Sequence, residues 1–288
     1  MNASIGIIGG SGLENFDSGK IIGKVDIPTP FGMPSDLFTL VELNGTIAAI
    51  LPRHGKGHRI LPTDVNSKAN MWAFKSLGVH TIFAVSAVGS LAEEYKPGEF
   101  AVTTNIIDRT RQRPATFFGD GIVGHVAFAD PFCIKTQALI IEALEQTSHP
   151  FHKEATLIAM EGPAFSSKAE SHMYRSWNGQ IIGMTALPEA KLAREAEMCY
   201  ASIGMVTDYD CWREHEESVT VEYVMETMRK NVDGIKKLVP LLIEKLAKKD
   251  TCVCHSAAAG AIMTDLTMVP YETKRKLDIF YNKYWGNR

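Results

Sequence analysis

Strand-like and helix-like segments alternate along most of this chain, and the alternation constrains the fold more than any other sequence feature. Short apolar runs predict strands at 5–8, 37–43, 46–51, 81–85, 99–107, 155–160, 180–184 and 199–206. Helix-like segments are expected at 66–77, 131–146, 167–177, 188–197 and 219–238. The pattern predicts an α/β fold with a central mixed, mostly parallel β-sheet flanked by helices.

We expect one domain over residues 1–250, with 251–288 as a C-terminal helical extension packed on it. The last helix of the domain carries an apolar stripe of helical period, and Pro240 should kink or end it. Residues 108–130 form a long connection, which inside a compact domain is usually functional.

Composition excludes several classes of protein. The 288 residues carry a net charge of −3 with acids and bases interspersed, so no basic stripe indicates nucleic-acid binding. No apolar stretch has the length of a membrane span. The first apolar run indicates a strand rather than a signal peptide, so we expect a cytoplasmic enzyme or binding protein.

The cysteine pattern argues against zinc. The five cysteines are Cys133, Cys199, Cys211, Cys252 and Cys254. They form no CxxC pair and the chain has no HExxH, so we expect no metal site. The Cys252-Val-Cys254 segment leaves three interpretations open: a strained disulfide, a metal ligand pair, or inert thiols.

Several strand ends carry groups suited to an anion. In open α/β sheets, ligands bind beyond the carboxyl ends of the strands. Guanidinium, imidazole, hydroxyl and free backbone amide groups form a phosphate-binding inventory. These groups come from Ser11, Arg53, His54, Ser86, Ala87 and Thr185.

Neither of the common glycine-rich nucleotide motifs fits. A dinucleotide fingerprint starting at Gly10 would need glycine where Asn15 stands, and no Walker motif occurs. A nucleophile elbow around Ser11 fails because residue 13 is Leu. Arg53 and His54 can alternatively be read as a structural salt bridge and a core histidine.

Asp208 and Asp210 lie two residues apart where a strand should end, so both carboxylates can project to one side. Mutual repulsion and burial would raise their pKa values, and one of them could hold a proton near neutral pH. Such a pair can accept from an amino group and donate to a ring nitrogen. The alternative is a pair of solvated loop acids.

Ordered motifs from about residue 5 to 240 resemble the methylthioadenosine branch of the trimeric purine nucleoside phosphorylases. The motifs are Gly6–Leu13, Thr29–Gly32, Arg53–Gly55, Asn66 with Ala69-Asn70, Glu161–Ser167, Met184–Glu189 and Thr207–Trp212. The resemblance implies phosphorolysis of 5′-methylthioadenosine to adenine and 5-methylthioribose 1-phosphate in methionine and purine salvage. It implies no metal or organic cofactor, with phosphate as co-substrate, and a homotrimer.

The same resemblance assigns roles to individual residues. Asp208 is the catalytic acid at purine N7, and phosphate contacts Ser11, Arg53, His54, Ser86, Ala87 and Thr185. The nucleoside contacts Phe165, Ser166, Met184, Asp208, Tyr209, Asp210, Val221 and His125, the last from an adjacent subunit.

Three positions bear on the choice of substrate. Asp208 and Ser166 favour adenine over 6-oxopurines, and the apolar Val221 suits a 5′-methylthio group. A broader adenosine, inosine or methylthioinosine phosphorylase is the alternative. Two further alternatives are a nucleosidase that uses water and a non-catalytic nucleoside-binding protein.

Overall fold

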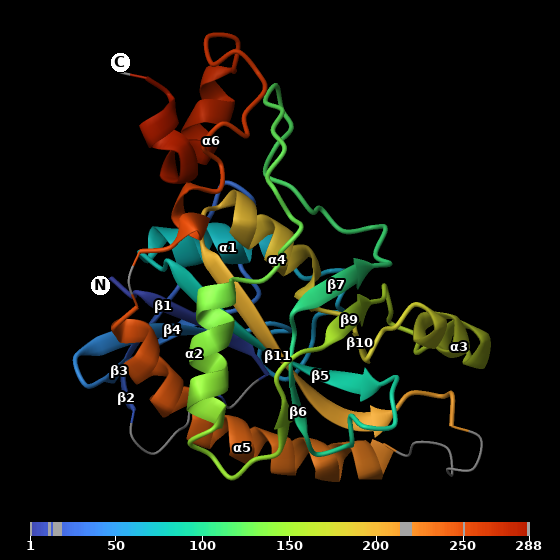
Figure 1. The fold of residues 1–288 in the computed structure, drawn as a ribbon. Helices are drawn as coiled ribbons and strands as arrows, with labels where there is room; N and C mark the ends of the chain where they lie inside the picture. The colour runs from blue at the N-terminus through green and yellow to red at the C-terminus, as the bar shows by residue number, and fades with distance from the viewer. Residues whose placement is uncertain (1, 11–12, 14–18, 214–220, 250, 287–288) are drawn as a thin grey trace.

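The computed structural model describes residues 2–10, 13, 19–213, 221–249 and 251–286, and these form a central sheet flanked by helices (Figure 1). The strands are β1 Ile5–Gly9, β2 Lys20–Val25, β3 Phe38–Leu43, β4 Thr46–Pro52, β5 Thr81–Ser90, β6 Phe100–Val102, β7 Asn105–Asp108, β8 Phe151–His152, β9 Thr156–Ala159, β10 Ile181–Gly183 and β11 Cys199–Tyr209. The α-helices are α1 Ser67–Ser76, α2 Ile134–Leu144, α3 Lys168–Ser176, α4 Ala186–Glu195, α5 Val221–Ala247 and α6 Tyr271–Tyr281. Two short 3₁₀ turns, η1 Val253–Ser256 and η2 Asn282–Tyr284, lie in the C-terminal segment.

Strand β5 organises the sheet. It pairs in parallel with β1 through its first half and with β11 along its whole length, while its last residues pair antiparallel with β10. Beyond β1 lie β4, β3 and β2, and beyond β10 lie β9 and β7. This mixed sheet, parallel for β4, β1, β5 and β11 and antiparallel at β2–β3–β4 and between β5 and β10, confirms the predicted fold class.

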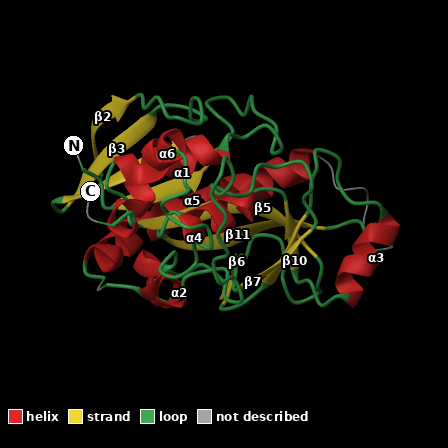
Figure 2. Ribbon diagram, turned by 90° about the horizontal axis from the view of Figure 1, so that it is seen from above, coloured by secondary structure: helices red, strands yellow, loops and turns green. Residues whose placement is uncertain are grey.

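Alternate residues of the central strands face two separate cores, as the two-residue period of a strand requires. One core joins Ile7 and Phe83 to α2 and α5, and the other joins Ile8 to α1, α4 and α6. The helices therefore cover both faces of the sheet. Figure 2 shows α3 apart from them, at the end of the sheet near β10.

Two predicted element boundaries are wrong. The helix predicted to end at residue 238 continues through Pro240 to Ala247, because the apolar side chains on both sides of the proline remain buried against the sheet; a kink at Pro240 stays a prediction. The predicted strand at 99–107 is two strands, since the chain changes partners midway. Thr103 N donates to Ser202 O of β11 and Thr104 N donates to Ala155 O at the start of β9.

The C-terminal segment contains α6, which lies against α1. Trp72 Nε1 donates to Lys276 O at 3.1 Å, and Tyr281 is completely buried and donates to Glu195 O at 2.9 Å. The boundary predicted at residue 250 falls on a residue outside the described ones. No helix that the structure describes combines the length and apolarity needed to cross a bilayer.

Candidate active site

The carboxyl ends of β1, β4 and β5 lie side by side. Gly9 of β1 is in register with Pro52 of β4, and Ile8 is in register with Ala84 of β5. Arg53, which follows β4, donates its backbone N–H to Gly9 O at 2.9 Å. The predicted phosphate residues on β4 and β5 therefore meet at one edge of the sheet, as the parallel arrangement requires.

Arg53 is buried at this edge and held by an ion pair. Its Nε donates to Glu189 Oε1 at 2.6 Å, its Nη2 donates to Oε2 at 3.1 Å, and its Nη1 donates to Val85 O at 2.8 Å. Tyr200 also donates to Glu189 Oε2, at 2.8 Å. Three of the five guanidinium N–H groups are thus used, and one hydrogen remains on each Nη. Arg53 therefore forms a structural salt bridge, as the alternative interpretation predicted, and still has two N–H donors for an anion.

His54 is neutral in this environment. Burial lowers the pKa of His54 to about 4, and the charges of Arg53 and His58 add to the effect. Nδ1 lies 2.8 Å from Ile60 O, and since a carbonyl only accepts, Nδ1 carries the proton. Nε2 then has no hydrogen-bond partner among the described residues and can accept.

Two of the predicted phosphate-binding hydroxyls are in direct contact. Ser86 Oγ and Thr185 Oγ1 lie 2.7 Å apart, because antiparallel pairing of β5 with β10 places them opposite each other. Ala87, next to Ser86, is exposed. This pair lies beside Arg53, which contacts the carbonyl of Val85.

Asp208 and Asp210 lie at the end of β11, farther along β5 from Ser86. Asp208 is in register with Gly89, and Asp210 N donates to Ser90 O at 2.9 Å. A Cβ on Gly89 would lie 3.1 Å from Asp208 Oδ1 and 3.6 Å from Asp210 Cβ. Both acids therefore flank the space that glycine leaves open, on one side of β11. They are not solvated loop acids, because β11 extends through Tyr209 and Asp210 is only 9% exposed.

Burial perturbs both carboxyl groups. It raises the pKa of Asp208 from 3.8 to about 6; the Thr207 hydroxyl, 2.7 Å away, opposes the rise and the charge of Asp210 adds to it. Burial also raises the pKa of Asp210, partly offset by hydroxyls and a backbone amide nearby. Asp210 Oδ2 is buried without a hydrogen-bond partner among the described residues, so it is an acceptor available to a ligand.

The segment before α3 lies next to the two acids. Ser166 O accepts from Cys211 Sγ at 3.1 Å, which brings Ser166 beside Asp210. Phe165 is 84% exposed, an unusual state for a large apolar ring, and a bound planar ligand would cover it. Tyr209 donates to Glu93 O at 3.3 Å, which anchors the end of β11.

The structure connects Met184 to the site through Arg113, a residue that the sequence interpretation missed. Arg113 Nη1 donates to Met184 O and to Leu187 O, the latter at 2.7 Å, and Nε pairs with Glu161 at 2.9 Å. Arg113 thus ties the segment after β9 to the segment after β10. Its position in the long 108–130 connection was the available signal. Glu189, the partner of Arg53, was missed although it ends the Met184–Glu189 motif.

The structure does not test two of the predicted residues, and it places a third elsewhere. Ser11 lies outside the described residues, and the side chain of Val221 is not described. His125 is exposed and donates its backbone N–H to Ala261 O at 2.9 Å. Its loop extends beside the C-terminal segment, away from the ends of β5 and β11 (Figure 1).

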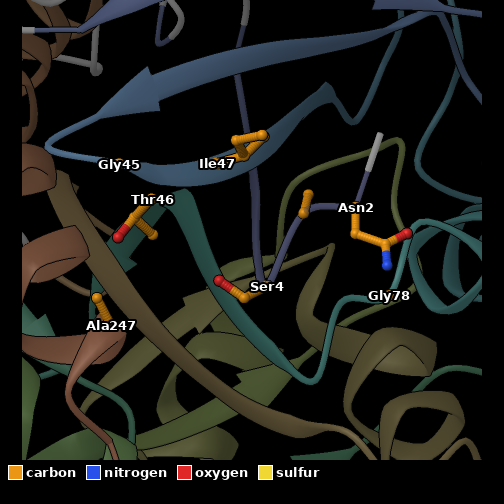
Figure 3. A pocket seen from close by; sticks show the side chains of 8 residues that line it. Asn2, Ser4, Gly45, Thr46, Ile47, Gly78 and Ala247 are labelled. Atoms are coloured by element: carbon orange, nitrogen blue, oxygen red, sulfur yellow. The ribbon is translucent and has the colours of Figure 1, made fainter.

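A surface hollow of about 270 Å³ lies at the opposite edge of the sheet, before β1 and β4 (Figure 3). It is lined by Asn2, Ala3, Ser4, Gly45, Thr46, Ile47, Gly78 and Ala247. None of these side chains titrates, so the hollow lacks a side chain for acid–base chemistry.

Comparisons with known proteins agree with this arrangement. Residues 4–244 match the phosphorylase superfamily. S-methyl-5′-thioadenosine phosphorylase of Koribacter versatilis is 48% identical over 288 residues, covering all of this chain and 99% of its own length.

Solved structures agree as well. Methylthioadenosine phosphorylase from an Antarctic soil metagenomic library superposes with a TM-score of 0.93 at 43% identity, covering 97% of this chain and 99% of that one. Methylthioadenosine phosphorylase from Schistosoma mansoni, in complex with adenine, gives 0.85 at 34% identity over 91% and 99%. This chain therefore belongs to the phosphorylase superfamily, as the resemblance of its motifs predicted.

Proposed function

We propose that this chain catalyses phosphorolysis of S-methyl-5′-thioadenosine, giving adenine and 5-methylthioribose 1-phosphate. One observation carries the proposal. An anion-binding group and a buried acid pair lie along the same strand, β5: Ser86 contacts Thr185, and three residues farther Gly89 lies beside Asp208 of β11. At roughly 3.3 Å per residue the two are about 10 Å apart, a span that a ribose and a purine can bridge.

The phosphate end has donors on a rigid support. Arg53 offers two hydrogens, Ser86 and Thr185 offer hydroxyls, and the neutral Nε2 of His54 can accept a proton from the hydroxyl of a phosphate. In the proposed reaction a phosphate oxygen forms a bond to C1′ while the C1′–N9 bond breaks. The fixed dianion stabilises the oxocarbenium-like sugar and then captures it.

The base end supplies the proton. The electron pair of the C1′–N9 bond goes to adenine, which leaves readily when N7 is protonated. With a pKa of about 6, roughly one Asp208 in ten is protonated at pH 7. Asp210 Oδ2 is an acceptor without a partner among the described residues, which suits the 6-amino group.

We propose the narrower assignments on the same basis. Phe165 would cover the purine ring, Met184 the ribose, and Val221 the 5′-methylthio group. His125 would reach a neighbouring site in a homotrimer, because its loop lies away from the strand ends of its own chain. The reaction draws on side chains, with phosphate as co-substrate, and its products suit salvage of adenine and of methylthioribose.

The test measures adenine or hypoxanthine release from methylthioadenosine, adenosine and inosine, each with and without phosphate. We expect phosphate-dependent release, highest with methylthioadenosine. Release unchanged by phosphate removal would indicate a nucleosidase, and binding without release would indicate a non-catalytic protein. A preference for inosine would favour the 6-oxopurine alternative. Light scattering that gives a fully active monomer would contradict the trimer.

A further inference from the structure

Four of the five cysteines meet in one buried cluster far from the catalytic strand ends. The Sγ atoms of Cys133, Cys199, Cys252 and Cys254 all lie within 4.8 Å of one another, and those of Cys133 and Cys252 are 3.6 Å apart. These side chains are between 0% and 9% exposed. They come from the residue before α2, the start of β11, and both ends of the CxC segment at η1. We call them the cysteine cluster.

The arrangement matches the coordination shell of one metal ion. Zn²⁺ in a structural site is held tetrahedrally by four ligands with Zn–S distances near 2.3 Å, which places the sulfurs roughly 3.8 Å apart. The 3.6 Å between Cys133 Sγ and Cys252 Sγ is close to that distance, and no pair of sulfurs in the cluster exceeds 4.8 Å. A disulfide holds its two sulfurs about 2.05 Å apart, whereas the four cysteines of the cluster are free thiols in this structure. Two disulfides are the competing arrangement, and the thiol count described below distinguishes them from a metal site.

A cation faces the sulfurs. Lys249 Nζ lies 3.9 Å from Cys133 Sγ and donates to the hydroxyls of Thr136 and Thr81 at 2.9 and 3.2 Å. Among the described ion pairs Lys249 has no carboxylate partner, so the sulfurs are the negative groups available to it. His255 Nε2 lies 3.5 Å from Cys199 Sγ. Four thiolates around Zn²⁺ carry a net charge of −2, which an ammonium and an imidazole N–H stabilise.

We propose that the cysteine cluster is a structural zinc site that fastens the C-terminal segment to the α/β domain. Cys133 and Cys199 belong to the domain, while Cys252 and Cys254 belong to the segment after α5. That segment also pairs with the loop that carries His125, through Gly124 opposite Ile262 and Met263 N donating to Val123 O at 2.9 Å. The zinc ion therefore fixes both the C-terminal segment and this loop.

The first experiment needs no variant. Full-length protein purified with reductant and without chelator is analysed for metals, and we expect about one zinc per chain. A second preparation, purified without reductant, is chelated, denatured and titrated for thiols, and all five cysteines should react. Zinc well below one per chain, another metal in its place, or a thiol count of three or one would overturn the proposal.

Cobalt gives an independent readout. Reconstitution of the metal-free protein with Co²⁺ should produce thiolate-to-cobalt charge transfer and intense visible bands of a tetrahedral site, lost on addition of Zn²⁺. A weak octahedral spectrum would contradict a four-sulfur shell. This measurement decides the question even where a cysteine variant fails to fold.

Variants then identify the ligands. Cys252→Ser removes a ligand and should weaken zinc binding more than about 100-fold, because loss of a residue that only contacts a ligand already costs roughly 10- to 100-fold. Cys211→Ser, outside the cluster, should keep one zinc per chain. Lys249→Met should weaken binding about 10-fold, and the matched change Lys248→Met, at an exposed neighbour, should leave it unchanged. Equal zinc affinity in Cys252→Ser and Cys211→Ser would overturn the assignment.

Discussion

A buried cluster of side chains lies at each end of strand β11, and the two clusters differ in how they are built. At its carboxyl end Asp208 and Asp210 lie two residues apart in one short motif, beside Gly89 of the neighbouring strand. At its amino end Cys199 meets three cysteines from two other segments of the chain. The acid pair keeps an acceptor without a described partner, which suits a ligand that comes and goes. The sulfurs face one another and a cation, which suits a permanent ion.

If the two ends are independent, changes at one should leave the other intact. The predictions below concern the carboxyl end, and in each variant the zinc content is expected to remain at the wild-type value. Additivity is usual for groups without shared partners, and Cys199 lies nine residues along the strand from Asp208.

The largest effect is expected for Asp208→Asn, which removes the proton donor and keeps the shape of the side chain. We expect kcat/KM for methylthioadenosine to fall about 10²- to 10⁴-fold, the usual size of a general-acid contribution. The loss with inosine should be smaller, because asparagine can donate to a 6-oxo group. Steady-state kinetics on both substrates checks this, and equal losses would contradict the role at the base edge.

The next effect is expected for Glu189→Gln, which leaves the charge of Arg53 buried and unpaired. Breaking a buried pair in this way costs about 3–5 kcal/mol of unfolding free energy. The phosphate KM should rise as well, because Arg53 loses its support. Urea unfolding and phosphate titration measure the two effects. The control is Glu226→Gln, in an exposed pair with Lys230, which should cost below ~1 kcal/mol.

A third effect concerns pH. Because the pKa of folded Asp208 is raised from 3.8 to about 6, its protonated form stabilises the fold below pH 4. This contribution is lost as the pH rises through 6, by up to about 3 kcal/mol at 1.36 per unit. Asp208→Asn should therefore gain stability relative to wild type between pH 4 and pH 7. If the difference in unfolding free energy between the two proteins stays constant from pH 4 to pH 7, burial does not raise the pKa of this carboxyl group.

The smallest effect is expected for Gly89→Ala, because the added Cβ would lie 3.1 Å from both Asp208 Oδ1 and Ile182 Cγ2. A small displacement of Asp208 should lower kcat/KM about 10-fold, or 1.4 kcal/mol, with the phosphate KM unchanged. Gly23→Ala on β2, where nothing lies within 4 Å, is the control and should behave as wild type. An increase in the phosphate KM would mean that the two ends of the substrate site are not separate.

The acid pair could be predicted because its information is local. Two acids after an apolar run mark a strand end, and an α/β pattern places strand ends at a binding edge. Arg53 and His54 were found by the same argument. Their partners were not, because Glu189 lies 136 residues from Arg53 in the sequence and only packing brings the two together.

The cysteine cluster could not be predicted from short sequence motifs. The absence of a CxxC pair was taken as evidence against zinc, but Cys133 and Cys252 are 119 residues apart and meet only in the folded chain. The end of the helix near Pro240 was predicted wrongly for a related reason. A proline removes one helical hydrogen bond, and burial of Leu238, Val239 and Leu242 against the sheet outweighs that loss.

The sequence by itself determined the alternation of strands and helices, the polar strand ends, and the family to which they belong. These depend on period, turn residues and short motifs, which act over a few positions of the chain. Tertiary structure alone decided the pairing of Arg53 with Glu189, the raised pKa of Asp208 and the convergence of four sulfurs. Each of these depends on distance and burial between residues far apart in sequence, and only the packed sheet and its helices set those quantities.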